Sequence, residues 1–126
     1  MNWDEYKTKF DEILDGVDHE QPYDNPAYLN YVKLNSSRID RWLKKTSLSE
    51  ETKNVIDQVD CHQKWILITE PWCGDAAHIA PIIALFAEYS DNIHFEIHLR
   101  DDDSNLIDSY LTNGSKAIPK LIARND

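Results

Sequence analysis

Cysteine and glycine are scarce in this chain of 126 residues, which holds two Cys, three Gly and five Pro. Two cysteines do not build a disulfide scaffold, so a free thiol with a chemical role is possible. Low glycine and proline with 41% hydrophobic residues exclude a collagen-like repeat, a low-complexity linker and a disordered tail. The length suits one domain with one hydrophobic core.

Positively charged residues and long apolar runs are also few. Thirteen Lys and Arg stand against 23 Asp and Glu, a formal net charge of -10. Such an acidic surface repels phosphate backbones and anionic lipid, which argues against nucleic acid and membrane as partners. No apolar run approaches the roughly 18–20 residues of a transmembrane helix, and Met1–Glu5 has no signal-peptide character. We therefore expect a cytoplasmic protein.

Apolar residues recur at helical spacing in the first half of the chain. The spacing and the capping residues predict helices over 3–14, 26–44 and 50–59. Residues 1–61 then form a helical N-terminal extension, packed on the remainder as part of a single structural unit.

The pattern changes near residue 62. Trp65–Thr69 is a continuous β-prone run, Ile93–Leu99 alternates between apolar and polar residues, and Pro119–Ala123 is a last short strand. Helices are expected between them, over 76–89 and 104–111. Strands that alternate with helices predict an α/β fold whose sheet begins parallel.

A cysteine lies between the first predicted strand and the helix that follows, in the string Glu70-Pro71-Trp72-Cys73-Gly74-Asp75-Ala76. The amides of a helix N-terminus favour the thiolate of Cys73, which is the nucleophilic form. Gly74 leaves room for a close approach by another backbone or sulfur. The carboxylate of Asp75 opposes the thiolate only weakly, since water and salt screen it. We expect an accessible Cys73 that reacts faster than Cys61.

These residues resemble the thioredoxin active-site motif, Trp-Cys-Gly-x-Cys. Ile118-Pro119 is similar to the cis-proline pair that faces the active cysteine in that family, and its proline follows Cys73 by 46 positions, a similar separation. Leu99-Arg100-Asp101 and Tyr110–Gly114 resemble a bacterial single-cysteine branch with a helical N-terminus. The resemblance covers roughly 62–126 and implies a thioredoxin-like fold and a cis peptide bond before Pro119. We expect no cofactor.

The position of the second, resolving cysteine holds Ala76 instead. Without that thiol the chain can form a mixed disulfide but cannot release it by an internal bond. Cys61 cannot replace it, because at about 3.3 Å per residue the strand separates the two cysteines by far more than the roughly 7 Å that a disulfide allows. We expect Cys61 to be half-buried at the strand entrance.

Three polar clusters contain residue types that can bind a metal. His94, Glu96 and His98 share one face of a strand but lack an obvious fourth ligand. Cys73, Asp75 and His78 have a possible zinc spacing, although an Asp in the first helical turn is explained by the helix dipole. Asp101–Asp103 lacks the glycine and distal Glu of a calcium loop. No metal site is therefore predicted.

The sequence is compatible with two functions. One is monothiol redox chemistry at Cys73 with a protein or a low-molecular-weight thiol or disulfide. The other is a non-catalytic module that holds an extended peptide in a groove lined by the residues around the cysteine and the proline. The groove residues are Trp72, Gly74, Asp75, Ile118 and Pro119.

The predicted domain also stops soon after its last strand, and Arg124–Asp126 is typical of the start of a turn. An open sheet edge would follow, and open edges pair with other chains. We expect either a fragment of a longer protein or a homodimer formed through this edge.

Overall fold

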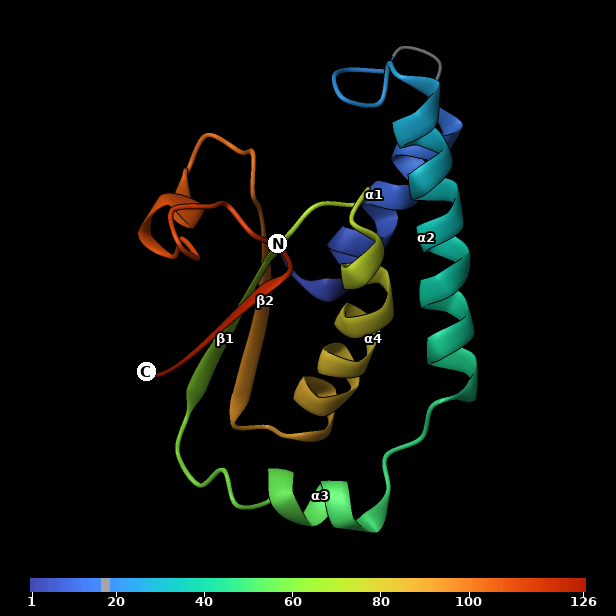
Figure 1. Cartoon of the computed structure of the whole chain (residues 1–126). Helices are drawn as coiled ribbons and strands as arrows, with labels where there is room; N and C mark the ends of the chain where they lie inside the picture. Colours follow the sequence, from blue (N-terminus) through green and yellow to red (C-terminus); the bar gives the residue numbers. More distant parts are fainter. Residues whose placement is uncertain (17–18) are drawn as a thin grey trace.

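The computed structural model describes residues 1–16 and 19–126. Three helices come first, followed by strands that alternate with helical segments, as the change of period predicts (Figure 1). The elements are α1 (Trp3–Asp15), α2 (Pro26–Lys45), α3 (Glu50–Ile56), β1 (Gln63–Thr69), α4 (Gly74–Tyr89), β2 (Ile93–Leu99), the 3-10 helix η1 (Leu106–Ser109) and β3 (Lys120–Asn125). The prediction of an α/β fold is confirmed. No helix in the described part of the chain is long and apolar enough to cross a membrane.

Side-chain caps explain where the first three helices begin. The Asn2 side chain accepts a hydrogen bond from the amide of Glu5, whose own side chain accepts from the Asn2 amide. Asn25 caps α2 through the amide of Ala27, and Ser49 caps α3. Each cap satisfies an amide that has no partner within its helix.

The sheet has the order β2-β1-β3. β1 and β2 run parallel with Leu67 opposite Ile97, as expected for a strand–helix–strand unit. β3 runs antiparallel to β1, with Ile122 opposite Ile66. Because strands in parallel register end together, Glu70 and Arg100 leave the sheet at the same edge.

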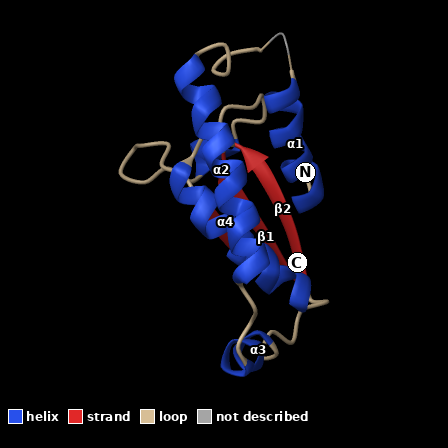
Figure 2. Ribbon diagram, turned by 90° about the vertical axis from the view of Figure 1, so that its right-hand side faces the viewer, coloured by secondary structure: helices blue, strands red, loops and turns tan. Residues whose placement is uncertain are grey.

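α1 and α4 pack on one face of this sheet, and α2 packs outside them. α1, α2 and α4 lie together on that side in Figure 1, and Figure 2 shows α3 beyond one end of them. The main core joins Tyr6, Phe10 and Val32 to Leu67 and Ile97. On the opposite face, Ile66 and Ile68 pack against Ile107 of η1 and against Ile118 and Ile122, which completes a second, smaller core.

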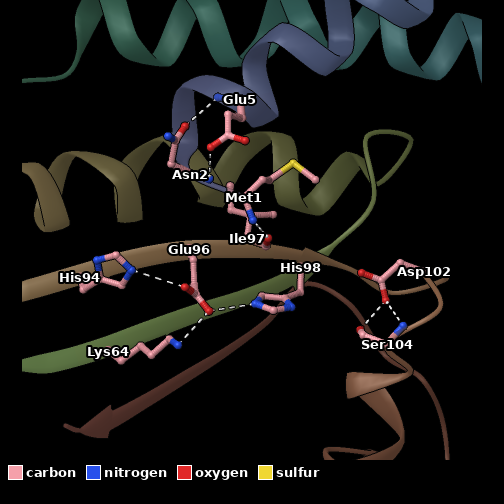
Figure 3. A network of polar contacts seen from close by, with 10 residues as sticks. All are labelled: Met1, Asn2, Glu5, Lys64, His94, Glu96, Ile97, His98, Asp102 and Ser104. Carbon is pink, nitrogen blue, oxygen red and sulfur yellow. Dashed lines mark hydrogen bonds and ion pairs between the residues drawn. The ribbon is translucent and has the colours of Figure 1, made fainter.

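The outer edge of β2 pairs with the first residue of the chain. The Met1 ammonium donates to the carbonyl of Ile97 at 2.9 Å, and the Ile97 amide donates to the carbonyl of Met1 at 2.7 Å (Figure 3). The N-terminal residue therefore occupies part of this edge, whereas the outer edge of β3 pairs with no strand in the described ranges 1–16 and 19–126.

Two local predictions are wrong. The helix expected over 104–111 is only the short η1, because the Asp102 carboxylate accepts from the Ser104 amide at 3.0 Å and Asn105 adopts a left-handed conformation, φ 51°. Of the turn expected at Arg124–Asp126, Arg124 and Asn125 instead belong to β3, with Asn125 opposite Gln63, and the Asp126 amide donates to the carbonyl of His62. Pairing with β1 outweighs the turn preference of these residues.

Candidate functional site

Cys73 is the N-cap residue of α4, in extended conformation. Its amide donates to the carbonyl of Glu70 at 3.0 Å, which closes the turn between β1 and the helix. Its Sγ lies 3.9 Å from the carbonyl oxygen of Ile118, 45 positions later in the chain, and the Ile118–Pro119 peptide bond is cis. The fold thus brings together the cysteine and the Ile-Pro pair that the sequence singled out.

The expectation of an accessible thiol at Cys73 is wrong, because only 7% of the residue is exposed. The side chain turns inward toward Ile118 rather than toward solvent. The sulfur of Cys73 is therefore largely shielded from solvent in this structure.

Ala76 lies in the first turn of α4, at the position of the second cysteine in the thioredoxin motif, and it is 2% exposed. Cys61 is exposed rather than half-buried, and its Sγ contacts Asn125 Oδ1 at 3.5 Å. It lies before β1 whereas Cys73 follows β1, so the two thiols stand at opposite ends of that strand. Both cysteines are free.

Trp72 is half-buried between an aromatic and a cationic neighbour. Tyr28 of α2 meets it edge to face, with ring centroids 5.8 Å apart. Arg100 lies over the Trp72 ring, with Cζ 5.0 Å from the centroid, and its Nε and Nη2 donate to the Asp101 carboxylate at 2.9 and 3.0 Å. The indole is therefore held in place by two different elements.

The remaining predicted residues differ in exposure. Asp75 is exposed, whereas Gly74, Ile118 and Pro119 are half-buried. A Cβ on Gly74 would lie 3.3 Å from Nη1 of Arg38, so the close approach at this glycine is made by an arginine of α2.

α2 contributes contacts that the sequence reasoning missed. Asn35, 1% exposed, donates from Nδ2 to the carbonyl of Pro71 at 2.9 Å and accepts from Arg38 Nη1 at 3.0 Å. One signal was available: Asn35 shares the helical stripe of Val32 and Ile39, and a polar residue in an apolar stripe requires a buried partner.

A comparison with protein families agrees with this geometry. A family model described as thioredoxin matches residues 22–126. The chain belongs to the thioredoxin family. No curated protein and no solved structure matches it. The matched range begins before α2, so in this thioredoxin-family protein it includes the helix that carries Asn35 and Arg38 as well as the sheet.

Glu70 is the buried carboxyl group of this thioredoxin-family site. Burial is the main reason that its pKa rises from 4.5 to about 7, and repulsion from Asp101 adds to the rise while Arg100 opposes it. Burial also raises the pKa of Tyr23, and the charge of Glu70 adds to that effect. The carboxyl group whose pKa is raised by burial therefore lies three positions before the cysteine.

Residues of the polar clusters that could bind a metal make other contacts. Glu96 faces Lys64 at 3.1 Å, His94 at 3.4 Å and His98 at 2.9 Å, as Figure 3 shows. Partial burial tends to raise the pKa of Glu96, but hydrogen bonds from His98 and Lys64 outweigh it and lower the pKa to about 2. His78 Nδ1 accepts from Trp42 Nε1 at 2.9 Å. Among residues 1–16 and 19–126, no three potential ligands converge on one point.

Proposed function

We propose that this thioredoxin-family protein carries out monothiol exchange at Cys73, and that it belongs to the single-cysteine branch of the family. The observation that carries the proposal is the position of Cys73, which lies at the N-terminus of α4 with its Sγ in contact with the Ile118 carbonyl. Ala76 occupies the place of a resolving thiol. The missing second thiol limits the reaction to mixed disulfides that an external thiol must release.

The proposed reaction needs one disulfide and one external thiol. The Cys73 thiolate attacks one sulfur of a low-molecular-weight or protein disulfide, and the other sulfur leaves as a thiolate that takes up a proton. A second thiol, such as glutathione, then attacks the mixed disulfide as its thiolate, and Cys73 leaves as a thiolate. Electrons pass from the external thiol to the substrate disulfide, so Cys73 ends unchanged. A reducing compartment such as the cytoplasm would keep Cys73 free for this role.

In this proposal the residues around Cys73 receive the substrate. Trp72 supplies a fixed aromatic wall, because Tyr28 and Arg100 hold its ring. Ile118 and Pro119 supply the facing wall, and Gly74 and Asp75 form the first turn of the helix below. These groups bind and orient a disulfide without a cofactor.

The alternative is a non-catalytic module that binds an extended peptide in the same groove. The 7% exposure of Cys73 favours it, since a buried sulfur is poorly placed to attack. The two functions differ in one measurable property, the rate at which Cys73 forms a mixed disulfide.

The deciding experiment compares the wild type with Ala76→Cys, both carrying Cys61→Ser. Oxidised glutathione should add to Cys73 in the wild type, as mass spectrometry of the intact protein shows, and insulin reduction should be almost absent. Ala76→Cys should form an internal disulfide and gain insulin reduction. Cys73→Ser should remove the glutathione adduct.

Each other outcome has a definite meaning. Glutathione addition at Cys73 no faster than at a thiol of the unfolded chain would favour the binding module. Equal insulin reduction by the wild type and Ala76→Cys would mean that another residue resolves the mixed disulfide, which would overturn the monothiol proposal.

A protein partner has a second surface to use, the outer edge of β3. Leu121 in this strand is 41% exposed, and exposed strand edges pair with other strands. A homodimer formed through this edge is the corresponding proposal. Light scattering after size exclusion should show a mass that rises with protein concentration; a monomer at every concentration would contradict it.

A further inference from the structure

Positive charge is concentrated on one helix of this acidic chain. α2 carries five of the thirteen Lys and Arg and a single carboxylate, although the whole chain has a formal net charge of -10. Four lysines of other segments and Arg100 lie in ion pairs with carboxylates. Among residues 1–16 and 19–126, none of the α2 cations does so. The five are Lys33, Arg38, Arg41, Lys44 and Lys45.

These cations lie on two sides of the helix. Lys33 lines a cavity with Leu14 of α1, and Asp40 lines another with Asp11 of α1, so both belong to the side of α2 that faces α1. Residues three and four apart share one side of a helix. By that spacing a different side carries a row of residues that are exposed or half-buried, which we call the α2 ridge: Tyr31, Leu34, Arg38, Arg41 and Lys45. The only carboxylate of α2 is not on this ridge.

The α2 ridge borders the turn that carries the site cysteine. A Cβ on Gly74, the residue after that cysteine, would lie 3.3 Å from Arg38 Nη1. Tyr31 meets Tyr28 edge to face with ring centroids 5.8 Å apart, and Tyr28 meets Trp72, the residue before the cysteine, in the same way. α2 lies on the side of α4 away from the sheet (Figure 1). A molecule that lies along the ridge therefore passes beside the site.

The two ends of the ridge differ in character. Tyr31 and Leu34, one turn apart, are 48% and 44% exposed and form an apolar end. Arg41 and Lys45 form a cationic end. At 1.5 Å per residue the ridge is about 21 Å long, which is the length of about six extended residues. A longer polyanion such as nucleic acid would extend from the ridge over acidic surface and be repelled. These dimensions fit a short segment in which apolar residues adjoin carboxylates.

We propose that the α2 ridge docks a short acidic segment of a partner protein. Its carboxylates pair with the three cations of the ridge, and its apolar side chains pack on Tyr31 and Leu34. The exposed carboxylate of Asp75, in the first turn of α4, opposes an anion beside Gly74, so the attraction rests mainly on the cationic end. Because charges are screened over about 8 Å at 0.15 M salt, these near cations outweigh the distant acidic surface.

The inference rests on the proposed function for the role of the partner, which would be the protein whose disulfide Cys73 attacks. Docking itself needs no thiol. The test therefore uses the full chain carrying Cys73→Ser, so that failure of docking and failure of thiol exchange are distinguishable. Glutathione addition to the wild type reports only on the thiol.

Fluorescence anisotropy of labelled hexapeptides at about 0.15 M salt measures docking. The two probes hold a pair of leucines before or after a run of glutamates, because the direction of the segment along the ridge is open. At least one of them should bind. The same peptide with glutamine in place of glutamate should bind at least about tenfold more weakly.

Two double variants of α2 provide the matched comparison. Arg41→Gln with Lys45→Gln removes two charges from the ridge and should weaken the bound peptide at least about tenfold. Lys33→Gln with Lys44→Gln removes the same charge from the other side of the helix and should weaken it less than about threefold. Circular dichroism should show that both variants keep the helical content of the parent.

Four results would overturn the proposal. The first is no binding by either acidic peptide, and the second is equal weakening by the two double variants, which would mean general attraction to a basic helix. The third is tighter binding of a single-stranded oligothymidylate of about the same length, which would assign the ridge to nucleic acid. The fourth is self-association of the full chain that Arg41→Gln with Lys45→Gln abolishes, because a second copy would then be the occupant.

Discussion

The side-chain amide of Asn35 donates to the carbonyl oxygen of Pro71 at 2.9 Å, which joins the middle of α2 to the turn that carries Cys73. Asn35 is 1% exposed and also accepts a hydrogen bond from Arg38, whose guanidinium lies beside Gly74. The helical half of the chain therefore contributes buried contacts to the candidate site. Residues that carry no recognisable motif hold the motif residues in place.

Replacement of Asn35 by alanine should lower the free energy of unfolding by about 1–3 kcal/mol, because the buried carbonyl of Pro71 loses its donor. Urea denaturation measures the loss. Asn30→Ala, an exposed site on the same helix, is the matched control and should change stability by less than about 1 kcal/mol. If both variants were equally stable, the Asn35–Pro71 contact would contribute nothing.

Glu70→Gln should make the protein more stable at pH 8 and leave it nearly unchanged at pH 4. The pKa of Glu70 is raised from 4.5 to about 7, so between these values the folded state binds more protons than the unfolded state and stability falls as pH rises. Glu70→Gln removes this loss of unfolding free energy at high pH, which is at most about 3 kcal/mol. Urea denaturation at both pH values, with Asp91→Asn as control, measures it. A gain of the same size at pH 4 would contradict the assigned cause.

Glu96→Gln should destabilise the protein at pH 7 by about 1 kcal/mol, because Lys64 and His98 lose a charged acceptor. The pKa of Glu96 is lowered to about 2, so its contribution is present above about 4.5 and is lost as pH falls toward 2. The difference in free energy of unfolding between wild type and Glu96→Gln should therefore decrease as the pH falls over that range. Glu88→Gln, exposed on α4, should have the same free energy of unfolding as the wild type at pH 7.

Gly74→Ala should leave the free energy of unfolding unchanged or raise it by up to about 1 kcal/mol. Alanine favours the helix, and the atom that its Cβ meets, Arg38 Nη1 at 3.3 Å, is the end of a flexible side chain that can move away. Gly114→Ala is the converse test, since Gly114 has φ 79° and alanine is strained there. Thermal unfolding should show a loss for Gly114→Ala; a comparable loss for Gly74→Ala would mean that Arg38 cannot move.

Much of the fold follows from local patterns. The continuous run at Trp65–Thr69 and the alternation at Ile93–Leu99 predict β1 and β2, because side-chain period reports which faces are buried. The structure of the segment after Asp101 could not be predicted from such local patterns. There the side chain of Asp102 and the left-handed Asn105 compete with a helix, and local hydrogen bonds of that kind leave no periodic signal.

The candidate site is also only partly predictable from the sequence. Cys73 at the start of a helix and Ile118-Pro119 at a matching separation are features of the sequence, and the contact between them follows once a thioredoxin-like fold is recognised. The roles of Asn35, Arg38 and Tyr28 were not predicted, since each depends on how α2 crosses the Cys73 turn. The crossing of two packed elements depends on their whole surfaces and is not encoded in either segment alone.

The amino-acid sequence by itself determined the order of helices and strands, the place of a lone cysteine at a helix N-terminus and the lack of a resolving thiol at Ala76. These are properties of neighbouring residues, and local physical chemistry reports them. Tertiary structure alone decided that Cys73 is buried, that Cys61 is exposed and that one buried oxygen of Glu70 has no donor among residues 1–16 and 19–126. Burial and hydrogen-bond partners depend on atoms supplied by distant segments, here α1, α2 and the residues after β2, which only the folded chain brings together.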